Sequence, residues 1–397
     1  MKKTWFKIAA IIFFLASFIR ITTINLPWIY SSLGPDFTQV WLSAKALVQA
    51  KEPYLAAGLN YPNAYPPISE IFFLPFALLS HQVALVLFTY ISFASIIGSV
   101  FLSLKIAAKK VPWHYFLLFI GLSFASFPIR FSLGMGQINM IVLFLLLLAV
   151  YFETRSVKNS PAAGLSLGMA IALKPIFAFF LLLFALKKSW KLIFTSTLTV
   201  AILIVVTLVF WSPQIWISWY QSAIFPLTSF TAPYLYVYPN QGAFGFISRL
   251  ITDMNVKIIL SRAVTVILVP LAAYIALKKK EYNLGLSFFI ITLLIFDITS
   301  WQHHFVWLMF PFVVLFVNIL KSKSAELLGL LILSYLLVSW NIENYTLYPN
   351  IILSNQFYGS LILWGLNFYF LNTRQIKTTK VDNGSIRYKI FEFLNLE

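Results

Sequence analysis

The chain has 397 residues, of which 60% are hydrophobic and only 10% are charged, and its formal net charge is +17. Soluble domains carry charge on about a quarter of their residues, so this composition excludes an ordinary soluble protein. Most basic residues lie in short clusters between apolar stretches, where membrane topology places them, and the charge therefore does not indicate nucleic-acid binding. The chain has no cysteine, which excludes disulfides and thiol catalysis.

Apolar segments approaching the ~30 Å thickness of the hydrocarbon core recur along the whole chain. They predict an all-α polytopic membrane protein with about twelve transmembrane helices and some interfacial helices on its outer face. We expect one transmembrane domain over residues 1–372 and a basic tail over 373–397. The first segment is expected to be a retained span and not a cleaved signal peptide. The predicted segments are 6–29, 82–104, 113–130, 137–152, 161–173, 176–187, 190–211, 257–277, 284–299, 303–320, 325–340 and 351–371.

The connections between these segments fall into two classes. Those on one side are short and contain, with the two termini, 21 of the 29 basic residues. The positive-inside rule assigns that side to the cytoplasm of a plasma-membrane protein, with both termini cytoplasmic. The connections on the other side are rich in Tyr, Trp, Pro, Asn and Gln, so function is expected on the outer face. They are residues 30–81, 212–256, 300–303 and 341–350.

One of the 12 acidic residues, Asp36, follows the first apolar segment directly after Gly34 and Pro35. The stretch that comes next has the apolar spacing of an interfacial amphipathic helix. The carboxylate either caps that helix or acts as a general base at the mouth of an outward-facing cavity. The two roles are compatible, because capping would fix the position of the carboxylate.

Residues 60–76 concentrate tyrosine and proline ahead of a further short helix. This pattern is typical of a rigid loop that enters an interfacial helix. It is also compatible with an aromatic wall of a site, to which Tyr65 would contribute. Glu70 lies on the helical continuation and is either a second carboxylate of the site or a surface charge.

The sequence GMGQIN is expected to open the fourth segment, where Gly134 and Gly136 permit a tight turn. Gln137 and Asn139 are costly in lipid unless they are paired or face a cavity, which makes them candidate site residues. Arg130 precedes them at the predicted outer end of the third segment. It either reaches into the headgroups or binds an anionic substrate.

Two short segments, 161–173 and 176–187, are joined at Lys174 and Pro175. A helix of about 13 residues is ~20 Å long, too short to cross the hydrocarbon core. Pro175 interrupts the helix because it lacks a backbone N–H. Lys174 is therefore expected at the outer tip of the pair, either as a cation on the floor of a cavity open to the outside or as a lysine that extends into the headgroups.

Two later outer connections contain the remaining polar candidates. The first has Asn240 and Gln241, followed by Arg249. The second, in the sequence TSWQHHFVWL, has His303 and His304. Adjacent residues of a helix point ~100° apart, and no further His or Cys is in register, so no metal site is predicted. The tryptophans of this stretch fit an interfacial belt, whereas the histidines are candidate donors to a phosphate or a sugar hydroxyl.

In chain order, these features resemble the polyprenol-phosphate-mannose-dependent mannosyltransferases of glycosyltransferase family 87. The resemblance covers roughly residues 5–320 and is carried by the ordered set of motifs more than by any single one. Gly242 departs from the family pattern, in which serine more often follows Asn-Gln. The motifs are Asp36 after the first segment, KEPY and YPP in the first outer connection, GQIN, AAGLSLGMAIALKP, NQG before Arg249, and SWQHH.

The resemblance implies a GT-C fold with its site on outer-face loops, here about residues 30–81 and 212–256. It implies inverting transfer of a hexose, with mannose first, from a polyprenyl-phosphate donor to a glycolipid or glycan acceptor, with Asp36 as the base. No metal or cofactor is required, because fixed cations can stabilise the departing phosphate. The residues expected to bind the donor phosphate and sugar are Lys174, His303, His304, Arg130, Gln137, Asn139, Asn240, Gln241, Arg249 and Tyr65.

Two other classes of function stay open at this point. A secondary transporter, or a flippase of lipid-linked sugars, also has about twelve spans. It is expected to show repeated halves and ionisable residues near the midplane, neither of which is evident here. A non-catalytic subunit that binds a lipid carrier is the other alternative, and it would tolerate Asp36→Asn where an enzyme would not.

Overall fold

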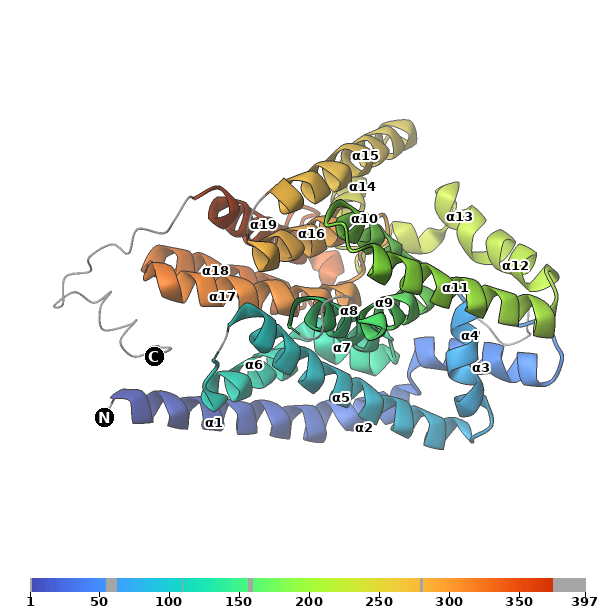
Figure 1. The fold of residues 1–397 in the computed structure, drawn as a ribbon, viewed down its shortest axis with the longest axis horizontal. Helices are drawn as coiled ribbons and strands as arrows, with labels where there is room; N and C mark the ends of the chain where they lie inside the picture. The colour runs from blue at the N-terminus through green and yellow to red at the C-terminus, as the bar shows by residue number, and fades with distance from the viewer. Residues whose placement is uncertain (1, 55–62, 109, 156–159, 279–280, 374–397) are drawn as a thin grey trace. The chain divides into compact units, whose positions relative to one another are not determined.

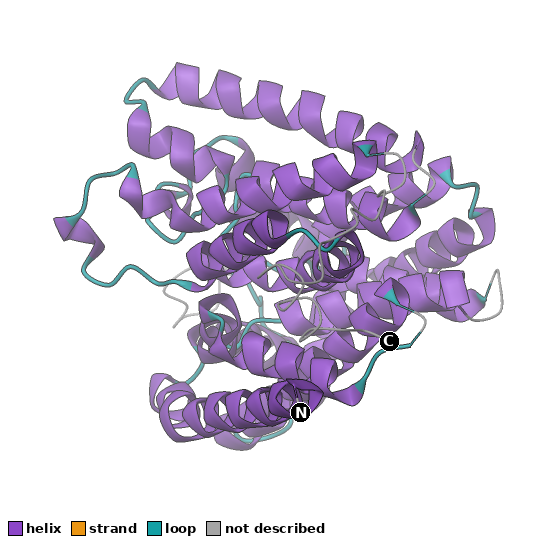
Figure 2. Ribbon diagram, turned by 90° about the vertical axis from the view of Figure 1, so that its left-hand side faces the viewer, coloured by secondary structure: helices purple, strands orange, loops and turns teal. Residues whose placement is uncertain are grey.

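The computed structural model describes most of the chain, and regular structure in the described residues is helical (Figure 2). An isolated antiparallel bridge joins Asn240 to Trp301. The basic tail predicted for residues 373–397 lies outside the described residues, apart from Thr373. The described residues are 2–54, 63–108, 110–155, 160–278 and 281–373.

The chain divides into two compact units, each built from stretches that are separated in the sequence. Unit 1 comprises Met1–Thr22, Val100–Arg130 and Tyr234–Glu397. Unit 2 comprises Thr23–Ser99 and Phe131–Pro233. The unit boundaries fall inside or next to helices, so that a continuous helix such as α5 contributes residues to both.

Unit 2 is organised around α9, which packs against both α8 and α11. A Cβ added at Gly164 or Gly168 would lie 2.5 or 2.6 Å from the Cβ of a threonine on α11, so the two small residues allow the helices to approach closely. In the same unit, α3 packs on α4. The helices are α2 (Leu26–Ser32), α3 (Pro35–Val48), α4 (Pro67–Ala77), most of α5 (His81–Ala107), α8 (Asn139–Arg155), α9 (Pro161–Leu173), η2 (Pro175–Ala178), α10 (Phe179–Leu186), α11 (Trp190–Trp211), α12 (Gln214–Trp219), η3 (Tyr220–Ile224) and α13 (Phe225–Thr228).

Unit 1 has α16 at its centre, packed against α15, α17 and α19, and α18 runs between α17 and α19 (Figure 1). The N-terminal helix α1 packs on α6. The helices are α1 (Lys2–Arg20), α6 (Trp113–Ala125), η4 (Pro233–Leu235), α14 (Ala243–Leu250), α15 (Met254–Lys278), α16 (Tyr282–Phe296), η5 (Gln302–Leu308), α17 (Met309–Ser322), α18 (Ala325–Ser339), η6 (Tyr345–Leu347), η7 (Ile352–Ser354) and α19 (Asn355–Asn372). Two further helices, η1 (Ile21–Asn25) and α7 (Phe127–Met135), extend across the unit boundaries, as does η4, whose first residue belongs to unit 2.

All twelve predicted apolar segments form helices, but they differ in length. Among the described residues, five helices are long and apolar enough to cross a membrane, and the pair α6 and α7, bent by 62°, would make a sixth. Length and composition thus support five or six crossings of the twelve predicted, and most other segments form shorter apolar helices. The five are Thr4–Ser32, His81–Ala107, Trp190–Trp211, Met254–Ala276 and Gln302–Ser322.

Candidate functional site

The first turn of α3 places Asp36 next to a polar cluster of unit 2. The helix begins at Pro35, a favoured first position because its missing N–H would be unpaired there. Gly34 is the N-cap residue, and no side chain caps the helix, so the capping role predicted for Asp36 is wrong. Instead, the side-chain amide of Gln137 donates a hydrogen bond to Oδ2 of Asp36.

Two glycines in the left-handed region bring these side chains together. Gly34 has φ +54° and Gly136 has φ +69°, values that favour glycine. A Cβ at Gly136 would lie 2.4 Å from the Cβ of Phe37, and one at Gly34 would lie 3.8 Å from the Cα of Gly136. The turn after α7 therefore packs directly on the start of α3, and its next residue, Gln137, reaches Asp36. The residues before this turn extend α7 and do not open the fourth segment as predicted.

Tyr65 orients Gln137 from the other end of its amide. The phenol of Tyr65 donates a hydrogen bond of 2.8 Å to Oε1 of Gln137. The backbone of Tyr65 is held on both sides, since its N–H donates to Oδ1 of Asn63 at 3.0 Å and its carbonyl accepts from the hydroxyl of Tyr54 at 2.9 Å. The predicted aromatic wall residue is thus part of a hydrogen-bonded network, in which Tyr54 of the KEPY motif takes part.

Glu70 extends the same network into the interior of unit 2. It lies in α4 with an exposed fraction of 0%, so its interpretation as a surface charge is wrong. The amide of Asn63 donates to its Oε1, while Oε2 has no hydrogen-bond partner among the described residues. Burial raises the pKa of Glu70 well above its usual range, and the hydrogen bond from Asn63 opposes this in part.

Lys174 supplies the cation of the cluster. The helix break predicted at this point is confirmed, because α9 ends at Leu173, Lys174 has an extended backbone, and Pro175 begins the 3₁₀ turn η2. The ammonium of Lys174 donates a hydrogen bond of 2.7 Å to Oδ1 of Asn139. Asn139 is the first residue of α8 and is completely buried, which fixes the acceptor in place.

The environment of Asp36 raises its pKa toward neutral pH. Burial raises the pKa of Asp36 to about 6, and the hydrogen bond from Gln137 and the positive charge of Lys174 limit the rise. A carboxylate with this pKa is ionised at pH 7 and is still a stronger base than an ordinary aspartate. The arrangement can therefore accept a proton from a hydroxyl group next to a fixed cation.

Arg249 and Asn240 form a separate cluster within unit 1. The guanidinium of Arg249 donates from Nη1 to the carbonyl of Asn240 at 2.9 Å, and from Nε and Nη2 to Oγ of Ser354 at 3.1 and 2.9 Å. The amide of Asn240 donates to the carbonyls of Leu235 and Ile298 at 2.9 and 2.8 Å. These contacts connect separate loops of unit 1. Burial lowers the pKa of Arg249 to about 10.

Gln241 and Gly242 belong to the same cluster. The amide of Gln241 donates to the carbonyls of Tyr238 and Leu353 at 2.9 and 2.8 Å. A Cβ at Gly242 would lie 2.8 Å from the Cβ of Ser300, so a serine at position 242 would require a local shift. The departure from the family pattern therefore has a packing reason. Leu353 lies beyond residue 325, in the part of the chain that carries none of the motifs of the resemblance, and its carbonyl contacts the NQG segment through Gln241.

The two histidines and Arg130 complete the candidates of unit 1. His303 and His304 lie in η5 and are buried, with exposed fractions of 4% and 7%. His304 stacks on Trp307 with ring centroids 5.4 Å apart. Arg130 lies inside α7, with its guanidinium 5.9 Å from the ring of Phe127. Within the described residues, no group of three His, Asp or Glu side chains is arranged to hold a metal ion.

The sequence profile of glycosyltransferase family 87 matches residues 63–311, more than half of the chain. The chain belongs to glycosyltransferase family 87. A relative in Mycobacterium tuberculosis (strain ATCC 25618 / H37Rv) is 26% identical over 302 residues, covering 71% of this chain and 68% of the relative. That relative is named a polyprenol-phosphate-mannose-dependent alpha-(1-2)-phosphatidylinositol mannoside mannosyltransferase. The predicted family is thus confirmed, and this chain is a membrane glycosyltransferase.

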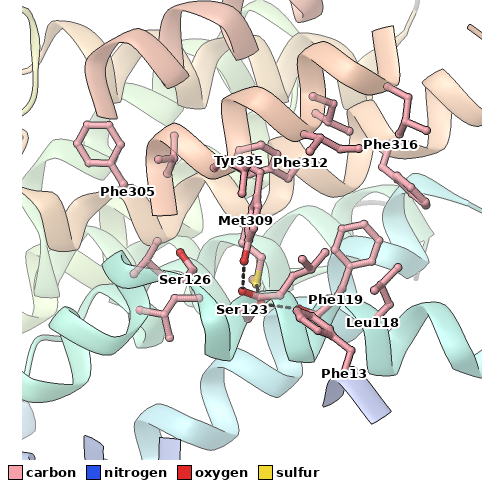
Figure 3. Close-up of a pocket in the computed structure, with 18 residues that line it drawn as sticks. Phe13, Leu118, Phe119, Ser123, Ser126, Phe305, Met309, Phe312, Phe316 and Tyr335 are labelled. Atoms are coloured by element: carbon pink, nitrogen blue, oxygen red, sulfur yellow. Dashed lines mark hydrogen bonds between the residues drawn. The ribbon is translucent and has the colours of Figure 1, made fainter. Parts of the chain in front are cut away.

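A cavity of about 450 Å³ in unit 1 of this glycosyltransferase has a different character from the polar cluster (Figure 3). Its wall is almost entirely hydrocarbon. The hydroxyls of Ser123 and Tyr335 donate to the carbonyls of Phe119 and Leu122 at 2.7 and 2.8 Å, and Ser126 accepts from a neighbouring serine at 3.3 Å. A wall this apolar offers little to bind a sugar or a phosphate, which makes the cluster around Asp36 the better candidate site.

Sequence patterns missed three residues that hold the candidate residues in place. Asn63, Tyr54 and Ser354 make the contacts described above, and of the three only Tyr54 stands in one of the motifs of the resemblance, KEPY. The signal for Asn63 was its position in the tyrosine- and proline-rich stretch of residues 60–76, and the KEPY motif did not indicate which contact Tyr54 makes. Ser354 gave no signal, because it lies beyond the part of the chain that resembles the family.

Proposed function

We propose that this protein transfers mannose from a polyprenyl-phosphate donor to a hydroxyl of a glycolipid or glycan acceptor. The transfer takes place on the outer face of the plasma membrane and inverts the anomeric carbon. The family supports glycosyl transfer, and the name of the mycobacterial relative supports the donor and a mannose-bearing lipid as acceptor. The observation that carries the proposal is the contact of Gln137 with Asp36 beside the charge of Lys174.

Asp36 acts as the general base. Its pKa of about 6 leaves it ionised at neutral pH, and the hydrogen bond from Gln137 fixes which oxygen is available. Oδ2 of Asp36 accepts from Gln137, so Oδ1 faces the acceptor hydroxyl. Tyr65 keeps the amide of Gln137 in the orientation that donates toward the carboxylate.

The reaction is a single displacement. The acceptor oxygen forms a bond to the anomeric carbon while its proton passes to Asp36. The bond from that carbon to the phosphate oxygen breaks, and the electron pair leaves with the polyprenyl phosphate. The phosphate needs no general acid, because it is a stable anion at neutral pH. One carboxylate is therefore enough for this step.

Lys174 stabilises the charge of the departing phosphate. It lies near enough to Asp36 to act on it electrostatically, and its ammonium is held by Asn139. A fixed cation in a site with little water stabilises developing negative charge more strongly than it would in bulk water. His303, His304 and Arg130 belong to unit 1 and are alternative candidates for the phosphate, in place of Lys174. The remaining ones, Asn240, Gln241 and Arg249, make the loop contacts of unit 1 described above.

The test is transfer by the purified protein in lipid nanodiscs, with radiolabelled polyprenyl-phosphate mannose and phosphatidylinositol mannosides as acceptors. We expect a labelled, larger glycolipid from the wild type and loss of at least about 100-fold in rate in Asp36→Asn. Asp253→Asn is the matched control, since Asp253 also sits at a helix start, where it accepts from the N–H of Val256. Absence of product, or labelled donor moved across the bilayer without a new glycosidic bond, would contradict the proposal and favour a flippase.

A further inference from the structure

A path of hydrogen bonds, which passes through the covalent frame of Tyr65 between its backbone N–H and its phenol, connects Glu70 in α4 to Asp36 in α3. Asn63 donates to Glu70 and accepts from the backbone N–H of Tyr65 at 3.0 Å. The phenol of Tyr65 donates to Gln137 at 2.8 Å, and Gln137 donates to Asp36. All these residues belong to unit 2. This hydrogen-bonded path therefore couples the fully buried carboxyl group of Glu70 to the carboxylate of Asp36, which is proposed as the base.

The orientation of each side-chain amide in this path is determined by its hydrogen-bond partners. The N–H of Tyr65 can only donate, so it requires Oδ1 of Asn63, and the NH₂ group of Asn63 must then face Glu70. In the same way, a phenol that donates to Oε1 of Gln137 turns the NH₂ group of Gln137 toward Asp36. If Tyr65 were lost, the Gln137 amide could rotate and present its carbonyl oxygen to the carboxylate, which would repel it.

We propose that Glu70 is a positioning residue, which acts through Asn63 and Tyr65 to hold Gln137 with its N–H toward Asp36. Glu70 serves as a hydrogen-bond acceptor in this role and does not exchange a proton during the reaction. Its isolation supports this role, because its exposed fraction is 0% and Oε2 has no partner among the described residues. A buried carboxyl in such a place is favoured in its neutral form.

Titration of Asp36 measures this role without relying on catalysis. The chain has four aspartates, so ¹³C-carboxyl labelling of aspartate gives few signals, and Asp36→Asn identifies the one that is lost. Wild-type Asp36 should titrate with a pKa of about 6. The other titratable groups near the start of α3 are Lys174, Tyr65 and His81, whose Nε2 lies 2.8 Å from Oγ1 of Thr38. They are retained in the Glu70 variants.

Glu70→Leu removes the acceptor for Asn63, and Tyr65→Phe removes only the oxygen that orients Gln137. Both should raise the titration midpoint of Asp36 by about one pH unit, because a hydrogen bond that favours its ionised form is weakened. Glu70→Gln keeps a neutral acceptor of the same shape, so it should leave the midpoint close to that of the wild type. Ser69→Ala is the matched control, since the Ser69 hydroxyl is equally buried and, among the residues that the structure describes, bonds only to the carbonyl of Pro66.

The kinetic readout rests on the proposed function. Glu70→Leu and Tyr65→Phe should lower kcat about tenfold with little change in the KM of the donor, and the acidic limb of the pH profile should move upward with the titration midpoint. Glu70→Gln should recover most of kcat. If Glu70→Leu fails to fold, Tyr65→Phe decides, because it removes a single oxygen.

Two results would overturn the inference. One is an unchanged Asp36 midpoint in Tyr65→Phe, which would show that the phenol does not control the Gln137 amide. The other is a Glu70→Gln variant as impaired as Glu70→Leu, which would show that the carboxyl itself takes part in proton transfer. A wild-type protein that titrates as described but does not transfer mannose would contradict the proposed function and leave the positioning role intact.

Discussion

The ammonium of Lys174 donates a hydrogen bond of 2.7 Å to the side-chain carbonyl of Asn139. This contact joins the break after α9 to the first residue of α8. Asn139 lies two residues after Gln137, the amide that orients Asp36. The cation and the base are therefore both positioned from one short stretch of chain between α7 and α8, which makes that stretch the framework of the proposed site.

Lys174→Met should reduce turnover about 100-fold and weaken donor binding, because it removes the fixed charge proposed to meet the phosphate. Lys174→Arg should recover part of the rate, since the charge is kept while its geometry changes. Steady-state kinetics of the purified variants measure both effects. Lys45→Met is the control, as Lys45 is also partly buried, 4.5 Å above the ring of Trp41. An unchanged rate and donor affinity in Lys174→Met would assign the phosphate to another cation, such as Arg130.

The pH dependence follows from the pKa of about 6 of Asp36. A general base must be ionised, so kcat should be constant near pH 7–8 and fall tenfold per unit as the pH drops below about 6. The effect of pH on the stability of the folded protein runs in the opposite direction to its effect on kcat. Because the pKa in the folded protein lies above the ordinary value of 3.8, the folded state binds more protons between about pH 4 and 6, and stability is lost as pH rises through that window.

These two effects are separable in a single comparison. The acidic limb is measured as kcat against pH for the wild type, and the stability difference is measured as Tm of the wild type minus Tm of Asp36→Asn over the same range. The difference should become more negative as pH rises from about 4 to 6 and then level off. A wild-type kcat that stays constant down to pH 4.5 would mean that Asp36 is not the base that limits the rate.

Gly136→Ala should lower both Tm and activity. A residue with a Cβ is strained at φ +69°, at a cost of roughly 1–2 kcal/mol, and the added atom would lie 2.4 Å from the Cβ of Phe37. The start of α3 must then move, and Asp36 with it. Gly329→Ala in α18 is the control, since a Cβ there meets nothing within 4 Å. Unaltered Tm and kcat in Gly136→Ala would show that the turn does not determine the position of Asp36.

The sequence predicted the features that local chemistry controls. Pro175 marks the end of α9, and the apolar spacing after Asp36 marks α3. The pairing of Asp36 with Gln137 spans 101 residues, and that of Arg249 with Ser354 spans 105. No pattern within one segment determines such pairs, because they depend on how the helices pack.

The role of individual polar residues was harder to predict for the same reason. The position of Asp36 after a glycine and a proline left both a cap and a general base open, yet Gly34 takes the N-cap position and the carboxylate accepts from Gln137 in the turn between α7 and α8. Glu70 has a charged side chain in an interfacial sequence, and only the fold shows that it is buried against Asn63. The residue types were informative about chemistry, whereas their partners required the three-dimensional structure.

Arg249→Met should lower the Tm of the detergent-solubilised protein and leave the KM of the donor unchanged. Its guanidinium holds the carbonyl of Asn240 and the hydroxyl of Ser354, and hydrogen bonds to a charged group are worth about 1.5–3 kcal/mol. Ser354→Ala should have a smaller effect of the same kind, and the double variant should be less destabilised than the sum, because the two residues share a contact. A raised donor KM with an unchanged Tm would instead make Arg249 a phosphate-binding residue.

The predicted orientation in the membrane is tested by cysteine labelling, which has no background because the chain lacks cysteine. Lys321 lies in the last turn of α17 on the side assigned to the cytoplasm by the basic clusters, and Leu347 lies in the 341–350 connection assigned to the outside. Both positions are exposed, with 78% of Leu347 accessible. An impermeant maleimide should label Leu347→Cys in intact cells and Lys321→Cys only after permeabilisation. The reverse pattern would place the 341–350 connection in the cytoplasm and would contradict an active site on the outer face.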